Sequence, residues 1–332
     1  MNSLNDLALG DWKAEWSAAF TRPEDLLAHL GLPLDLSPQH REAARRFAFR
    51  VPAAFAARMR RGDADDPLLR QVLPLGDELL ELPGFLADPV GDLAAAAVPG
   101  LLHKYQSRAL LIATAACAVN CRYCFRREFP YGEAQLSRRR EAQALAHIAA
   151  DASLHEIILS GGDPLALDDE RLAALVGGLA AIPHLRRLRI HTRLPIVLPA
   201  RVTAGLAQIL ATTRLKPVLV IHANHAQEFD DAVRFALDRL RGAGVALLNQ
   251  SVLLRGVNDS VDALAALSET LFDHGVTPYY LHLLDKARGT AHFDLAEAQA
   301  LALYDGLRRR LPGYLVPRLV REIAGEPYKT LV

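Results

Sequence analysis

Cysteine is scarce in this sequence of 332 residues, and its scarcity excludes a fold built on disulfides. The chain has only 3 cysteines, and free thiols are typical of a reducing compartment, for which the cytoplasm is the default. The sequence has no run of about 18 apolar residues, which is the length needed to cross a bilayer. Charged residues, including Asp11, Lys13 and Glu15, occupy the stretch where a signal peptide needs an apolar core. We therefore expect a cytoplasmic protein without a membrane partner.

Net charge is also missing. Lys plus Arg and Asp plus Glu number 38 each, so the formal net charge is zero. Nucleic-acid-binding proteins usually carry a basic surface, so we expect no nucleic-acid partner, and we interpret the basic stretch 41–61 as a solvated helix face. Lysine itself is rare, which limits the candidates for any chemistry that needs a lysine amine. The five lysines are Lys13, Lys104, Lys216, Lys286 and Lys329.

The few cysteines all lie in one short segment, at Cys117, Cys121 and Cys124. Thiolates are soft ligands that suit iron–sulfur clusters and zinc. A four-iron cluster held by three cysteines keeps one iron open, and an open coordination position is typical of a reactive metal site. The alternative is a zinc site completed by a histidine, but zinc ligands usually come in two short pairs and no second pair is present. The spacing therefore favours a 4Fe-4S cluster.

From about residue 105 onwards, short apolar runs recur along the chain. Between the runs there is room for a helix, and this alternation predicts parallel strands joined by crossover helices. Six such units are fewer than the eight of a closed barrel, so we predict an α/β fold with a partial (β/α)6 barrel. The runs are 109–114, 156–160, 187–191, 217–222, 245–253 and 278–283.

Proline-rich sequence precedes the barrel. Short helices are predicted there, including 25–30 and 39–50, because proline ends a helix. The predicted division is an N-terminal helical region (1–95), a partial barrel (96–310) and a C-terminal segment (311–332).

Polar residues gather where the predicted strands end. In barrels of this type the carboxyl ends of the strands carry the active site, so this placement favours an enzyme. Gln250 is the exception, because it lies within its strand. The strand-end residues are Cys117, Gly161, Gly162, Asp163, His191, Arg193, His222, Asn224, His282 and Asp285.

The cysteine segment, with Tyr123 before its last cysteine, resembles the signature of radical S-adenosylmethionine (SAM) enzymes, in which the open iron binds the amine and carboxylate of SAM. The surrounding segments narrow this resemblance to the lysine 2,3-aminomutase family, from about Phe47 to the C-terminus. The run 321–329 resembles a shorter branch, which makes β-lysine for modification of elongation factor P. The supporting segments are 105–108, 124–127, 160–163, 250–259 and 284–286.

This resemblance implies three cofactors. The cysteines would hold the 4Fe-4S cluster, and pyridoxal 5′-phosphate would be carried as an imine by Lys329, with Lys286 as the fallback. Without the resemblance, Lys329 would be interpreted as a solvated tail residue. Arg108 would bind the cofactor phosphate and Tyr105 would lie against the pyridine ring. The residues implied in SAM binding are Tyr123, Ser160, Gly161, Gly162, Asp163 and Gln250.

The resemblance also implies how L-lysine would bind. Arg126 would take the substrate carboxylate, and Asp285 and Glu322 the distant ammonium. Relatives have aspartate where this chain has Glu322, a departure that would alter the depth of the pocket or the stereochemistry of the product. Longer relatives bind zinc through additional cysteines, whereas this chain has Ser260 at one such position, so we expect no zinc.

The implied partners are a small electron-transfer protein of flavodoxin or ferredoxin type and a downstream ligase for elongation factor P. A homo-oligomer is compatible with the resemblance. Two alternatives stay open. One is a radical SAM enzyme acting on another amino acid, such as glutamate or arginine, or on a macromolecule, although Asp285 favours a cationic side chain. The other is a non-catalytic metal-binding module, which the polar residues at the strand ends argue against.

Overall fold

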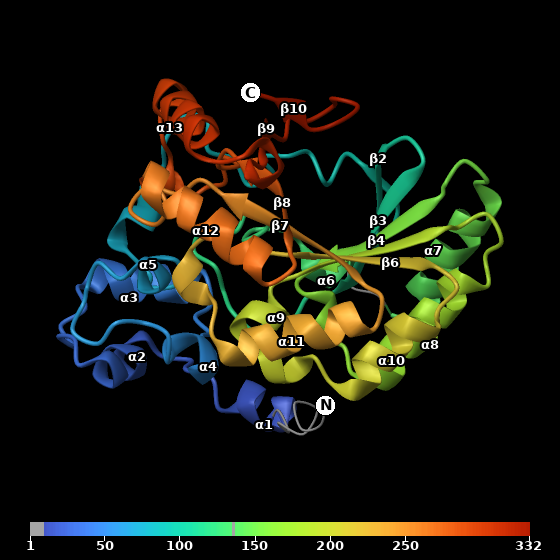
Figure 1. Ribbon diagram of the computed structural model, residues 1–332, viewed down its shortest axis with the longest axis horizontal. Helices are drawn as coiled ribbons and strands as arrows, with labels where there is room; N and C mark the ends of the chain where they lie inside the picture. Colours follow the sequence, from blue (N-terminus) through green and yellow to red (C-terminus); the bar gives the residue numbers. More distant parts are fainter. Residues whose placement is uncertain (1–9, 135–136) are drawn as a thin grey trace.

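A computed structural model describes residues 10–134 and 137–332, and its centre is one curved sheet (Figure 1). The spatial order of the strands is their order along the chain, β1 to β10. Seven strands, β3 to β9, pair in parallel. They are β3 (Arg108–Thr114), β4 (Glu156–Gly161), β5 (Arg187–Thr192), β6 (Lys216–Ile221), β7 (Ala246–Val252), β8 (Thr277–His282) and β9 (Arg318–Arg321). A sheet whose end strands do not pair is an open barrel, so the predicted partial barrel is confirmed.

The two edges of the sheet are antiparallel additions. On one side β1 (Ala96–Val98) and β2 (Leu101–Tyr105) precede β3, and on the other β10 (Thr330–Leu331) pairs with β9. The six predicted strands correspond to β3 to β8. Strand β9 adds a seventh parallel strand within the segment predicted as a C-terminal tail. The boundaries proposed at 95 and 310 stay predictions.

Helices cover the outer face of the parallel strands, as crossover connections require (Figure 1). They are α7 (Arg138–Ala150), α8 (Asp169–Ala180), α10 (Ala204–Thr212), α11 (Asp231–Gly242), α12 (Val261–Asp273) and α13 (Glu297–Arg310). The short helices α6 (Tyr131–Ala134) and α9 (Leu194–Val197) belong to the connections that follow β3 and β5. Five of the long helices begin after a Ser, Thr or Asp whose side chain accepts a backbone N–H of the first turn, which satisfies one of the free donors there. Because helices cover the outside, the central strands can be apolar on both faces, and every residue of β4 is buried.

The N-terminal region is made of short helices, as predicted. They are α1 (Trp12–Ser17), α2 (Pro23–Leu30), α3 (Pro38–Arg46), α4 (Ala53–Ala56) and α5 (Pro67–Arg70). The helix predicted over 39–50 ends at Arg46, because the chain then extends to pair Val51 with Phe20. Residues 1–9 of the predicted region lie outside the described residues. The apolar side chains of this region join those of the barrel in one core.

Short 3-10 turns complete the connections, and two of them contribute to the site described below. They are η1 (Gly76–Leu79), η2 (Pro164–Ala166), η3 (Pro199–Arg201), η4 (Ala226–Glu228), η5 (Ala291–Phe293) and η6 (Gly313–Leu315). Across residues 10–134 and 137–332, none of the helices has the length and apolar character needed to cross a bilayer.

Candidate functional site

The three cysteines lie in the loop that follows β3, at the carboxyl end of the parallel strands. The loop turns tightly, with the backbone N–H of Cys124 donating to the carbonyl of Cys121 at 3.0 Å. Burial raises the pKa of Cys117, and it raises that of Cys124 to about 11. These thiols would therefore lose their protons only to a bound metal. In the described part of the chain, no group of three or more His, Cys, Asp or Glu residues is placed to hold a metal ion as it stands.

A fully buried ion pair attaches this loop to the N-terminal region. Arg122 donates through Nε to Glu78 at 2.8 Å, and its other nitrogens donate to the carbonyls of Phe47 and Ala43 at 2.9 and 3.1 Å. Arg127 donates to the same Glu78 carboxylate at 2.6 Å. Glu78 is thus shared by two arginines that flank the last cysteine. The N-terminal region therefore helps to position the cysteine loop.

The two glycines at the end of β4 are required by close packing within the protein. A Cβ on Gly161, whose φ is 119°, would lie 2.6 Å from the carbonyl oxygen of Thr114, and one on Gly162 would lie 2.5 Å from that of Ala116. Glycine is required because the turn packs against the start of the cysteine loop. The approach to a ligand inferred from the sequence is therefore at least partly an approach to the chain itself. A role of these glycines in SAM binding stays a prediction.

Hydrogen bonds from within the protein occupy the carboxylate of Asp163. Its carboxylate accepts hydrogen bonds from Leu165 N at 3.0 Å, Thr192 Oγ1 at 2.6 Å and Arg193 N at 2.7 Å. The side chain therefore ties the ends of β4 and β5 together. Its predicted contact with SAM stays a prediction.

Three neutral histidines line the inner side of the barrel: His191, His222 and His282. Burial, with nearby Arg193 and Lys329, lowers the pKa of His222 to about 4, and burial also lowers the pKa values of His191 and His282. His282 Nε2 lies 3.2 Å from Oε1 of Gln250. The Nε2 atoms of His191 and His222 are buried without a hydrogen-bond partner. Such atoms are costly unless a ligand satisfies them.

The C-terminal segment places Lys329 at this same lumen. Its Nζ donates to Glu322 Oε2 at 2.6 Å, while Tyr105 donates its hydroxyl to Glu322 Oε1 at 2.5 Å. Glu322 follows β9 and Tyr105 ends β2. The contact therefore crosses the gap between the two sides of the open sheet. The predicted tail lysine is thus docked rather than solvated.

A chain of alternating charges continues from Glu322 to Arg126. Lys104 lies 3.7 Å from Glu322 and 2.6 Å from Asp92, and Arg126 Nε donates to Asp92 at 2.7 Å. Arg126 also donates to the hydroxyl of Ser160 at 3.0 Å. The residues predicted to hold the two ends of a substrate are therefore joined by Asp92 and Lys104, which the sequence did not single out.

Asp285 follows β8 beside the same lysine. Burial raises its pKa to about 7, although the charge of Lys329 opposes the shift. Glu322 behaves in the opposite way: burial would raise its pKa, but Lys329 and Tyr105 together hold it below the ordinary value. The site thus contains one carboxyl that titrates near neutrality and one that stays charged.

The other predicted residues differ in how well they are placed. The fallback Lys286 is exposed and pairs with Asp294 at 3.2 Å, so its amine is not part of the charged row that contains Lys329 and Glu322. Arg108 stacks on the ring of Tyr105 at 4.4 Å and has no ion pair among the described residues. Tyr123 accepts a hydrogen bond from Asn224 at 2.8 Å and from Arg193 at 2.6 Å.

Comparison with known proteins decides the family. The chain is 50% identical to the L-lysine 2,3-aminomutase of Escherichia coli (strain K12), over 99% of this chain and 96% of that protein. It is 47% identical to the enzyme of the same name from Haemophilus influenzae, over 97% and 95%. The chain belongs to the L-lysine 2,3-aminomutase family. It is therefore an isomerase, and the resemblance found in the sequence is confirmed.

More distant similarities agree in kind. The chain is 32% identical to the L-lysine 2,3-aminomutase of Clostridium subterminale, over 99% of this chain and 79% of that protein. Residues 107–182 match a family described as a 4Fe-4S single cluster domain. A radical SAM methyltransferase from Sphaerobacter thermophilus aligns with 67% of this chain and 68% of its own, with a TM-score of 0.47 and 17% identity. That partial structural likeness adds nothing to the assignment.

Lysine 2,3-aminomutases use a 4Fe-4S cluster, SAM and pyridoxal phosphate, and the donors of this chain fit that set. Three thiols share one loop, an amine lies at the lumen, and two histidine nitrogens are buried there without partners. The fit of the cluster rests on the chemistry and spacing of the thiols, since their side chains are not preassembled around a metal.

Several residues of the site were not singled out by sequence reasoning, and they share one property. Each is linked to the site by contacts between parts of the chain that are far apart in sequence, so local spacing does not reveal its role. A partial signal existed for Asp92 and Glu78, because acidic residues in an apolar, proline-rich stretch often pair with buried cations. The residues are Gln71, Glu78, Asp92, Lys104, Arg122 and Glu228.

Proposed function

We propose that this isomerase converts L-lysine to β-lysine by moving the 2-amino group to carbon 3. The observation that carries the proposal is the charged row from Arg126 to Lys329 beside the cysteine loop. Arg126 would bind the substrate carboxylate, while Asp285 and Glu322 would bind the distant ammonium. The bound cofactors would supply hydrogen-atom abstraction at carbon 3 and a carrier for the migrating amine.

Charge balance supports a cationic side chain on the substrate. At the tail end of the row, Glu322 and Asp285 face Lys104 and Lys329. A substrate ammonium would add a positive charge beside these two carboxylates, whereas the side chain of glutamate would add a third negative charge in a partly buried place.

The remaining roles follow from position. Lys329 would carry pyridoxal phosphate, because its amine faces the lumen while that of Lys286 faces Asp294. Arg108, at the start of β3, lies against Tyr105, at the end of β2, and the two would bind the phosphate and the ring. Cys117, Cys121 and Cys124 would bind the cluster. The residues proposed to bind SAM are Tyr123, Ser160, Gly161, Gly162, Asp163 and Gln250.

We propose further that the product supplies β-lysylation of elongation factor P, by way of a ligase. The support is the higher identity to the Escherichia coli protein, 50%, than to the clostridial one, 32%. A flavodoxin- or ferredoxin-type protein in a reducing cytoplasm would supply the electron.

The test is an anaerobic turnover assay. Protein with a reconstituted cluster receives SAM, pyridoxal phosphate, dithionite and L-lysine, with L-glutamate and L-arginine in parallel reactions, and chiral mass spectrometry separates the products. We expect β-lysine from lysine alone. Cleavage of SAM without β-lysine would reject the substrate while keeping the radical chemistry. Absence of both products, in protein that lacks iron, would reject the metal assignment.

A further inference from the structure

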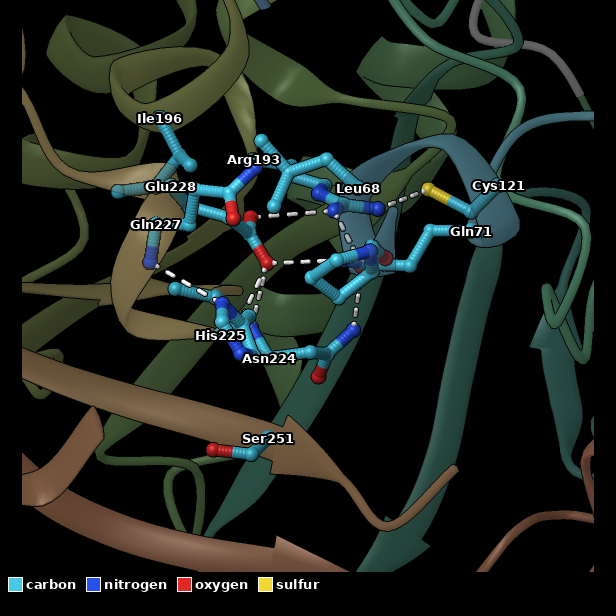
Figure 2. A network of polar contacts seen from close by, with 12 residues as sticks. Leu68, Gln71, Cys121, Arg193, Ile196, Asn224, His225, Gln227, Glu228 and Ser251 are labelled. Carbon is cyan, nitrogen blue, oxygen red and sulfur yellow. Dashed lines mark hydrogen bonds and ion pairs between the residues drawn. The ribbon is translucent and has the colours of Figure 1, made fainter. Parts of the chain in front are cut away.

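Arg193 touches the cysteine loop from the barrel side. It follows β5, is 6% exposed, and donates through Nη1 to Cys121 Sγ at 2.8 Å (Figure 2). The same nitrogen donates to the hydroxyl of Tyr123 at 2.6 Å. Arg193 is therefore in direct contact with one of the three proposed cluster ligands.

Two further residues hold the guanidinium in place. Its Nη2 donates to Gln71 Oε1 at 2.7 Å and to Glu228 Oε2 at 3.1 Å. Glu228 is itself fixed, because the backbone N–H groups of Asn224 and His225 donate to its other oxygen at 2.8 and 3.1 Å. Figure 2 shows Arg193 between Glu228 and Cys121. The arginine thus has little freedom to move away from the sulfur.

A buried ion pair at this place needs an explanation other than stability. Removing two charges from water costs about as much as their attraction returns, so apolar residues of similar size often stabilise a protein equally well. The side chains of Arg193 and Glu228 are 7% and 0% exposed. A positive charge that donates to the sulfur of a redox centre has a direct chemical effect, which apolar residues would not supply.

We propose that Arg193 is a positioning residue that raises the reduction potential of the cluster, with Glu228 moderating the effect. One electron enters a 4Fe-4S cluster on reduction, and the cluster becomes more negative by one charge without binding a proton. A cation and a hydrogen bond at the Cys121 sulfur stabilise the reduced form more than the oxidised form, since hydrogen bonds and net charge set the potentials of such clusters. This inference rests on the proposed cluster ligation by the three cysteines.

Removing the charge of Arg193 or of Glu228 should shift the midpoint potential of the cluster in opposite directions, and the test depends on this contrast. Arg193→Gln removes the cation and leaves Glu228, so the midpoint potential should fall. Glu228→Gln removes the opposing anion and keeps the guanidinium, so the potential should rise. Each change should alter the reduction equilibrium about tenfold or more, which is about 59 mV for one electron. Arg193→Lys keeps the charge without the planar fork and should give a smaller fall.

The measurement is an EPR-monitored titration with dithionite and redox mediators on reconstituted protein, together with iron content per chain. Arg201→Gln is the matched control, since Arg201 is also buried but donates to the carbonyls of Leu165 and Leu167 and pairs with Asp169 at 2.8 Å instead. Its potential should equal that of the wild type. A role limited to folding would lower iron content in both Arg193 and Glu228 variants without opposite shifts.

The outcomes separate the two proposals. If the wild type fails to hold four irons, the proposed cluster falls. If the wild type holds them and the variants share its potential, only the inference about Arg193 falls. If Arg193→Gln does not retain a cluster, the opposed directions of Arg193→Lys and Glu228→Gln decide, and shifts of the same sign would overturn the inference.

Discussion

The two sides of the site are fastened in different ways. The cysteine loop is held by ion pairs that are essentially inaccessible, with the side chains of Arg122 and Glu78 0% and 1% exposed. The C-terminal segment is held by Lys329 and Glu322, which are 23% and 10% exposed. On the first side, Arg122 also donates to backbone carbonyls of the N-terminal region. On the second side, the C-terminal segment ends in a strand of only two residues, β10.

This difference indicates which side is held more loosely. A buried pair resists separation, because each charge left alone in the interior costs several kcal/mol. A partly exposed pair separates at small cost, since water replaces the lost partner. The cysteine-loop side is therefore a fixed platform, and the C-terminal side is held more loosely. Local stability of this kind differs between parts of one fold.

Removing the tail amine should have the largest effect. Lys329→Ala should abolish both β-lysine formation and the imine absorbance of bound pyridoxal phosphate, because Lys329 is proposed to carry the cofactor and the amine of Lys104 in the same row is held in an ion pair with Asp92 at 2.6 Å. Lys286→Ala, which removes an exposed lysine paired with Asp294, should leave both unchanged. Absorbance spectroscopy and the turnover assay read the two results. An imine that survives in the first variant and vanishes in the second would move the assignment to Lys286.

Breaking the platform should cost the most stability. Glu78→Gln leaves Arg122 and Arg127 without their shared carboxylate, and we expect the free energy of unfolding to fall by about 3–5 kcal/mol. Glu42→Gln breaks an exposed pair with Arg46 at 3.2 Å and should cost less than about 1 kcal/mol. Urea denaturation of both variants checks the contrast. Equal losses would mean that the cysteine loop is not anchored through Glu78.

Loosening the tail should have a smaller and local effect. Glu322→Gln weakens the contacts to Lys329 and Tyr105, at a cost of about 1 kcal/mol for a partly exposed pair. Hydrogen exchange of residues 322–332 should then quicken about fivefold, and the KM for lysine should rise. Glu326→Gln removes the same charge from an exposed position of the same segment. It should leave exchange and KM unchanged. Unaltered exchange in Glu322→Gln would show that the segment is held by other contacts.

The same contrast explains what the sequence could predict. The strands β3 to β8 and the cysteine loop follow from local patterns, namely apolar runs and close ligand spacing. The ion pairs that fix the two sides join residues far apart in the chain, such as Arg122 with Glu78 and Tyr105 with Glu322. No local pattern encodes such a pair. The predicted helix over 39–50 was too long for a similar reason, since pairing of Val51 with Phe20 takes the chain out of the helix.

A further effect concerns pH and separates the two carboxyls of the tail side. Burial raises the pKa of Asp285 to about 7, whereas that of Glu322 is held below its ordinary value. A substrate ammonium needs Asp285 ionised, so lysine should bind about tenfold more tightly as the pH rises from about 6 to 8. Asp285→Asn should bind weakly at every pH and lose this dependence, as the pH profile of kcat/KM would show.

Stability should change with pH in the opposite sense. The native state holds a proton on Asp285 between about pH 4 and 7 that the unfolded chain has already lost, so native binds more protons than unfolded over this window. The stabilisation that this group contributes is present below about pH 4 and is lost as the pH rises through about 7. The difference in unfolding free energy between wild type and Asp285→Asn should therefore move against the wild type across that window. A difference that stays constant would mean that Asp285 is ionised throughout, and the pH dependence of binding would then need another group.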